Sequence, residues 1–146
     1  MVMEIEFPRK LQLAYHAVCR PLCKRLDLSQ TAFDILMFFG NNPEYRTARD
    51  VVEIRNIKAN LVSVNVERLV REGYLERHSV AGDRRKMELL CTEKAKPVIL
   101  EGRAVQQDFR EKLLDGMEEE TQRIFQRALK GHGTQHRRDF EGSTIK

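Results

Sequence analysis

The apolar residues of the chain recur mainly at spacings of three and four, which is the period of an amphipathic helix. This pattern predicts a first helix over residues 8–26, with Pro8 in its first turn and Pro21 expected to kink it or end it early. Gly102 is expected to bend a later, longer helix. Further helices are expected over residues 29–39, 47–55, 58–72, 92–114 and 117–130.

Short polar signals mark where these helices begin and end. Ser29 is expected to cap the second helix, and Thr47 opens the third with an acidic residue three positions later, a variant of the capping box. Gly40 should break the chain after the second helix, and Gly73 should stop the fourth. Asn56 suits a left-handed turn between the third and fourth helices, and two short helices so joined form a helix-turn-helix.

Two strand-forming segments, Tyr74 to His78 and Met87 to Cys91, flank a loop over residues 79–86 with glycine near its tip and three consecutive cations. A helix followed by such a hairpin fits duplex DNA, since the helix suits the major groove and an arginine suits the minor groove. We expect Asp83 to orient Arg85 for insertion through a bidentate ion pair, with Arg84 and Lys86 on phosphates. The alternative is a solvated turn with a weak surface ion pair.

The fourth helix should bury the side of Val62 and expose the opposite face. On that face Asn60 suits an adenine edge, Ser63 a base or a phosphate, and Leu61 and Val64 the methyl groups of thymine. Two arginines suit phosphates, although both also stand at i,i+4 spacing from a glutamate. The predicted DNA-binding residues are Lys58, Asn60, Leu61, Ser63, Val64, Arg68, Arg71, Arg84, Arg85 and Lys86.

The positive charge is concentrated in the same region. The 146-residue chain has a net charge of +4, and residues 46–86 hold ten Lys or Arg against six Asp or Glu, which accounts for the whole excess. Such a concentration is typical of a phosphate-facing surface, and the alternative is a merely solvated one.

The composition is that of one helix-rich domain with a real core, since 41% of the residues are hydrophobic and 33% are charged. No apolar run is longer than Ile35 to Phe39, so we expect no membrane span and no membrane partner. The N-terminal residues have no signal-peptide pattern, and three cysteines suggest free thiols in a reducing compartment. We therefore expect a cytoplasmic protein.

Several segments, in order, are similar to one known family. They are Leu28-Ser29-Gln30 with Phe33-Asp34-Ile35-Leu36, Thr47-Ala48-Arg49-Asp50-Val51, the run from Glu67 to Arg77, Gly82-Asp83-Arg84-Arg85, and Leu90-Cys91-Thr92-Glu93-Lys94. Over residues 11–130 this combination resembles the MarR family of winged-helix regulators. The sequence departs from the family where Leu61 and Val64 replace residues that are commonly polar or basic, and where Asn65 and Ala95 replace a common apolar residue and a common glycine.

The resemblance implies a homodimeric transcription factor with a winged helix-turn-helix DNA-binding core and long helices forming a dimerisation region. One MarR-type domain is expected over residues 1–130, with dimerisation helices at 8–26 and 93–130, a winged helix-turn-helix at 29–91, and a flexible tail at 131–146. The two-fold dimer would bind a pseudo-palindromic operator on double-stranded DNA. Many members are repressors released by small, often aromatic, anions or by cysteine oxidation.

The residues that could sense such a signal lie on the first helix. Tyr15 and His16 could line a ligand pocket, although packing or interface roles are the alternative. Cys19 and Cys23 are close but poorly oriented for a disulfide within a helix, and neighbouring Arg20 or Lys24 would favour a thiolate. Buried, unreactive thiols are again the alternative, and Cys91 is expected in the core. The four histidines have no metal-ligand spacing.

Other functions have less support in the sequence. An enzyme is not expected, because there is no phosphate-binding loop, no nucleophile elbow and no paired acid and base; no catalytic residue, metal or cofactor is predicted. A thiol-based redox regulator, or a winged-helix module for protein or RNA, would keep the same fold. An arginine-tipped wing favours DNA, since a protein-docking wing would more often be apolar.

Overall fold

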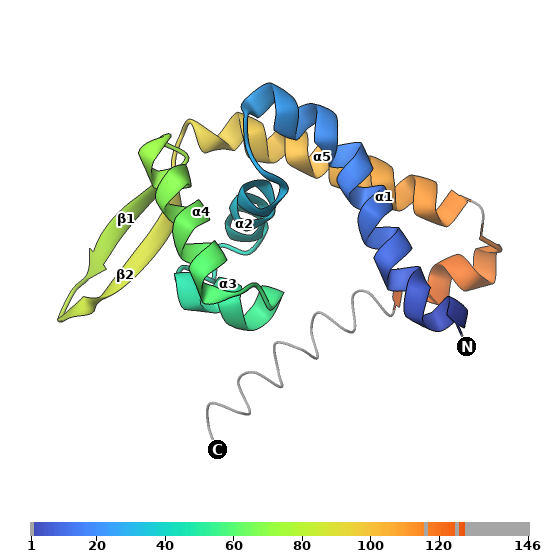
Figure 1. Ribbon diagram of the computed structural model, residues 1–146, viewed down its shortest axis with the longest axis horizontal. Coiled ribbons are helices and arrows are strands. Elements are labelled where there is room, and N and C mark those ends of the chain that lie inside the picture. The colour runs from blue at the N-terminus through green and yellow to red at the C-terminus, as the bar shows by residue number, and fades with distance from the viewer. Residues whose placement is uncertain (1, 116, 125, 128–146) are drawn as a thin grey trace, which may run out of the picture. The chain divides into compact units, whose positions relative to one another are not determined.

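The computed structural model describes residues 2–115, 117–124 and 126–127, apart from the side chains of residues 2–5 and 84. The described chain forms two compact units, divided after residue 107, and one long helix runs from the first into the second. The elements, labelled in Figure 1, are α1 (Val2–Leu26), α2 (Gln30–Asn41), α3 (Ala48–Arg55), α4 (Ala59–Arg71), β1 (Leu75–Val80), β2 (Asp83–Cys91) and α5 (Ala95–Asp115). The expected winged helix-turn-helix is therefore present.

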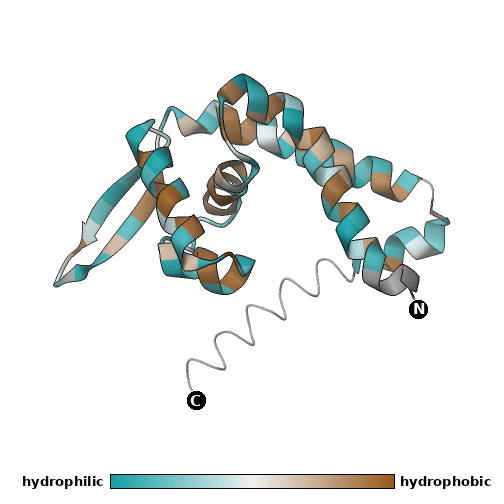
Figure 2. Cartoon of the chain, in the orientation of Figure 1, coloured by the Kyte–Doolittle hydropathy of each residue, from teal (hydrophilic) through white to brown (hydrophobic). Residues whose placement is uncertain are grey.

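Helix α2 forms the centre of the first unit. Ser29 caps it as predicted, since its hydroxyl oxygen accepts a hydrogen bond from the backbone N–H of Ala32 at 3.0 Å. Much of its surface is hydrophobic (Figure 2), and this surface is almost entirely covered. Its buried residues are Ala32, Phe33, Ile35, Leu36, Met37, Phe38 and Phe39.

Two glycines have packing roles that the sequence analysis did not predict, and Gly40 does not break the chain as expected. Gly40 lies inside α2, which ends only at Asn41, and a Cβ at Gly40 would lie 2.8 Å from the Cδ1 atom of Ile99 on α5. Gly102 on α5 is buried, and a Cβ there would collide with the sulfur of Met37 on α2. Both glycines therefore allow α2 and α5 to approach closely.

Helix α1 is longer than predicted and does not end early at Pro21, which lies inside it. Proline removes one helical hydrogen bond, but Cys19, Leu22 and Cys23 around it are buried, so packing holds this turn. The helix closes with a Schellman motif, in which the Leu28 N–H donates to the Cys23 carbonyl at 2.9 Å. Asp27 takes the left-handed position of this motif, with φ of 54°.

The helix-turn-helix follows its predicted capping. The Thr47 hydroxyl accepts from the Asp50 N–H, and the Asp50 carboxylate accepts from the Thr47 N–H, which completes the capping box of α3. Asn56 is left-handed, with φ of 55° and ψ of 41°, and turns the chain into α4. Helix α4 buries Val62, Val66 and Leu69.

The wing is a two-stranded antiparallel hairpin in which Leu75 pairs with Cys91 and Ser79 pairs with Met87. Its strands are longer than predicted, because pairing continues to Val80 and Asp83, and only two residues form the turn. Residues 83–86 therefore lie on β2, although a loop was expected there. The Leu89 N–H also donates to the Arg46 carbonyl at 2.6 Å, which ties the wing to the segment before α3.

Helix α5 begins at Ala95, three residues after the predicted start. Thr92 still acts as a cap, since its hydroxyl oxygen accepts from the Ala95 N–H at 3.3 Å and its O–H donates to the Gly73 carbonyl at 2.5 Å. Gly73 ends α4 as predicted, with a positive φ of 85°.

The second unit contains the end of α5, where Leu114 is buried. The Gln122 amide donates to the Leu114 carbonyl at 2.6 Å and to the Met117 carbonyl at 3.0 Å. Residues 119–124 and 126–127 are helical, within the predicted last helix. Residues 117 and 118, which were also expected in that helix, are not helical. Residues 125 and 128–130 of the predicted helix, and the predicted tail over residues 131–146, lie outside the described residues. No helix in the described ranges has both the length and the apolar character to cross a membrane.

Candidate nucleic-acid interface

The outer face of α4 has the composition predicted for it. Leu61 is 46% exposed and Val64 is 67% exposed, although both are large and apolar. Asn60 and Ser63 beside them are exposed, and so is Lys58 at the start of the helix. Helix α4 buries its opposite side, so this face remains open to solvent. It combines amide, hydroxyl and apolar groups that can contact the edges of bases.

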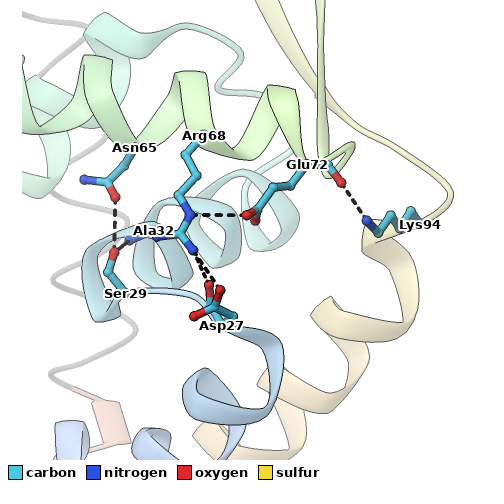
Figure 3. A network of polar contacts seen from close by, with 7 residues as sticks. All are labelled: Asp27, Ser29, Ala32, Asn65, Arg68, Glu72 and Lys94. Atoms are coloured by element: carbon cyan, nitrogen blue, oxygen red, sulfur yellow. Dashed lines mark hydrogen bonds and ion pairs between the residues drawn. The ribbon is translucent and has the colours of Figure 1, made fainter.

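The two arginines at the end of α4 have different environments. Arg71 is exposed and forms no ion pair with any described residue. The guanidinium of Arg68 donates to the Asp27 carbonyl at 2.5 Å and to the Glu72 carboxylate at 3.3 Å (Figure 3). Two of the three guanidinium nitrogens of Arg68, Nε and Nη2, are thus already bonded within the protein, which favours a structural role over the predicted phosphate contact.

The tip of the wing is cationic, but Asp83 does not act as predicted. Its carboxylate accepts a hydrogen bond from the backbone N–H of Arg85 at 2.9 Å, and no ion pair among the described side chains joins it to the Arg85 guanidinium. Asp83 thus holds the backbone at the start of β2. Arg85 and Lys86 are exposed, whereas the side chain of Arg84 lies outside the description.

Further cations accompany this surface that the sequence analysis did not single out. Arg49, Arg55 and Arg77 are exposed. Arg49 and Arg77 line a cleft of about 380 Å³, together with Ser63 of α4 and Met87 of the wing. Arg49 and Arg77 stand in segments that resemble the family, but the excess of positive charge over residues 46–86 does not distinguish one arginine from another.

A sequence comparison shows which protein family this arrangement resembles. The family model of the MarR family matches residues 26–86, from the end of α1 to the first part of β2. Over these residues the chain matches the MarR family.

Solved structures show the same fold. A MarR transcriptional regulator from Methanosarcina mazei Go1 is 16% identical, with 100% of both chains covered and a TM-score of 0.76. A MarR protein from Peptoclostridium difficile DA00132 is 16% identical, with 99% of this chain and 92% of that chain covered and a TM-score of 0.78. The reduced form of MarR from E. coli is 15% identical over 86% of this chain and 92% of that chain, with a TM-score of 0.69. No curated protein matches the sequence.

Neither Tyr15 nor His16 lines the cleft of about 380 Å³ beside the wing, and their role in a ligand pocket stays a prediction. The Tyr15 hydroxyl accepts a hydrogen bond from the Gln106 amide at 2.9 Å, and burial raises the pKa of the phenol. A cavity of about 410 Å³ lies elsewhere, between α2, β2 and α5, and neither Tyr15 nor His16 lines it. Its walls include Phe39, Tyr45, Arg46, Leu89, Ile99 and Arg103.

The cysteines of α1 are buried thiols. Cys19 is 0% exposed and Cys23 is 7% exposed, and neither forms a disulfide. Burial raises the pKa of Cys23 to about 11 and also raises the pKa of Cys19. The thiolate expected from neighbouring Arg20 or Lys24 is not favoured, because desolvation of the sulfur is the largest influence on both pKa values and neither cation offsets it. Cys91 is half-buried, and burial raises its pKa as well.

The described residues contain no group of three or more His, Cys, Asp or Glu arranged to hold a metal ion.

Proposed function

We propose that this MarR-family chain is a transcriptional repressor that binds double-stranded DNA as a homodimer and is released by a small ligand. The observation that carries the proposal is the exposed face of α4, where Asn60, Ser63, Leu61 and Val64 lie beside a cationic wing. Each α4 would enter a major groove and each Arg85 a minor groove. The similar Methanosarcina mazei protein is a transcriptional regulator by its title, which supports this role.

A second copy of the chain is the proposed partner for the long helices. Phe7 and Leu13 on α1 are 50% and 57% exposed, and Leu100 on α5 is 63% exposed. Large apolar groups on two helices of one unit favour burial against another subunit, and a two-fold dimer would present two α4 helices to a pseudo-palindromic operator. Sedimentation analysis should therefore give a dimer, and a monomer at micromolar concentration would contradict this assembly.

The most informative test is selection of bound sequences from random duplex DNA, which should recover two related half-sites about one helical turn apart. Binding to the selected site should weaken steeply with salt, with a slope of about −0.9 per phosphate neutralised. A flat salt response would favour the protein-docking alternative, and equal binding to single-stranded RNA would favour an RNA-binding module.

Arg85→Ala tests the wing. We expect it to lower the affinity for the selected site by about 1–3 kcal/mol while the dimer stays intact. Arg9→Ala is the matched control, since it removes the same charge from an exposed position on α1. Equal binding by Arg85→Ala and the parent protein in a gel-shift titration would refute the minor-groove role.

Ligand release is tested by repeating the titration with small aromatic acids, which should weaken binding if one of them resembles the effector. A thiol-based release has little support, because the two α1 thiols are buried and their pKa values are raised. If mild peroxide released the parent protein from DNA, and if Cys19→Ser and Cys23→Ser abolished that release, a thiol-based mechanism would be supported instead.

A further inference from the structure

A polar cluster joins α4 to the turn between α1 and α2. The guanidinium of Arg68 reaches across to Asp27, donating to its carbonyl at 2.5 Å and lying 3.5 Å from its carboxylate. The same guanidinium pairs with Glu72 one turn along α4 (Figure 3). Its side chain is only 32% exposed, so its donors are held between two parts of the protein.

The partner of Arg68 is an unusual residue for its position. Asp27 occupies the left-handed site of the motif that closes α1, where glycine is the common residue because it has no Cβ penalty. Aspartate tolerates this conformation better than most residues. The carboxylate next to Arg68 gives a physical reason for an acidic residue at this turn.

Two more contacts fasten the same side of α4. The Ser29 hydroxyl, which caps α2, donates to the Asn65 carbonyl oxygen at 3.1 Å, and the Asn65 amide donates to the Leu61 carbonyl at 2.8 Å. At the end of the helix the Lys94 ammonium donates to the Glu72 carbonyl at 2.6 Å. The Asn65 that departs from the family pattern thus connects α4 to the cap of α2.

These polar contacts constrain the direction of α4, which the apolar contacts of its buried side do not. Val62, Val66 and Leu69 hold the helix on the core, but aliphatic contacts are not directional and allow small rotations. Hydrogen bonds and ion pairs constrain direction as well as distance. We propose that Arg68, acting with Asp27, is a positioning residue that sets the orientation of α4 for sequence-specific DNA binding, an inference that rests on the proposed function.

The test compares Arg68→Gln with Arg71→Gln, because both remove one positive charge from the last turn of the same helix. Arg71→Gln should reduce the salt slope by about 0.9, as loss of one phosphate contact does. Arg68→Gln should leave that slope unchanged and lower affinity for the selected site roughly tenfold, since bonds to a charged group are worth about that factor. Its affinity for non-specific duplex should hardly change.

Asp27→Asn is a second, independent variant. Asparagine keeps the left-handed turn and the carbonyl that Arg68 binds, so only the negative charge is lost. Electrostatics alone predicts tighter DNA binding by this variant, whereas a positioning role predicts specific binding about two- to fourfold weaker, as expected for an exposed ion pair. Chemical unfolding of each variant shows whether it is folded. If Arg68→Gln does not fold, Asp27→Asn alone tests the proposal.

The outcomes separate the two proposals. A parent protein that does not bind duplex DNA selectively would refute the proposed function and the positioning role with it. If the parent protein binds, a salt slope for Arg68→Gln that falls as it does for Arg71→Gln would make Arg68 a phosphate contact instead. Unchanged or tighter specific binding by Asp27→Asn would likewise overturn the positioning role.

Discussion

Helices α2 and α4 are nearly equal in length, with 12 and 13 residues, but they use their surfaces in opposite ways. Helix α2 buries seven of its residues and is covered by neighbouring elements on most sides. Helix α4 buries three and exposes a leucine and a valine on its outer face. Helix α2 is therefore central to the core, whereas α4 contacts the core along one side.

The difference indicates which positions of each helix can be substituted without loss of the fold. A helix that is apolar all round contributes stability at almost every position. A helix with a narrow buried stripe leaves the remaining positions free for a partner, and its orientation then depends on polar contacts such as those of Arg68. Stability and recognition should accordingly respond to mutations in different helices.

The largest expected effect is on stability through α2. Phe33 is 0% exposed, so Phe33→Ala should lower the free energy of unfolding by about 3–5 kcal/mol through lost burial and the cavity left behind. Val64→Ala on the outer face of α4 is the control and should change it by no more than about 0.5 kcal/mol. Urea denaturation monitored by circular dichroism measures both. Similar losses for the two variants would contradict the contrast between the helices.

The next effect is on recognition through α4. Asn60→Ala should weaken binding to the selected operator by about 1–3 kcal/mol, because an amide that pairs with a base edge is lost. Its free energy of unfolding should stay within about 0.5 kcal/mol of the parent value, since Asn60 is exposed. Repeating the sequence selection with the variant should relax preference at one base position in each half-site. Retained preference at every position would show that Asn60 does not contact a base.

The smallest expected effect depends on pH and concerns Asp34, a polar residue within α2. Burial raises the pKa of its carboxyl, and the hydrogen bond from Gln30, at 2.9 Å, and the charges of Arg55 and His16 offset only part of this rise. A carboxyl with a raised pKa stabilises the folded state below its unfolded pKa of about 4, and that contribution is lost as the pH rises through the raised value.

Asp34→Asn should therefore be more stable than the parent protein at pH 7, and the difference should shrink as the pH falls toward about 4. Thermal unfolding across this range measures the change. Glu67→Gln makes the equivalent substitution on the exposed side of α4 and serves as the control. A destabilised Asp34→Asn variant at neutral pH would mean that the charged carboxylate has a favourable partner.

The local features of the fold were predictable from the sequence alone. The caps at Ser29 and Thr47, the left-handed turn at Asn56 and the stop at Gly73 all appear where they were expected. Each depends on hydrogen bonds or backbone angles within a few residues, so neighbouring residue types are sufficient to specify it. The exposed face of α4 was predictable for the same reason, since helical period alone determines which positions share a side.

Tertiary structure decided the features that join distant parts of the chain. Gly40 and Gly102 resemble helix breakers in sequence, but each gives space to a side chain on another helix. Arg68 resembles a phosphate contact until Asp27, forty-one positions earlier, is found beside its guanidinium. A single residue type cannot reveal such roles, because close packing, desolvation and ion pairing depend on which groups the fold brings within a few ångströms.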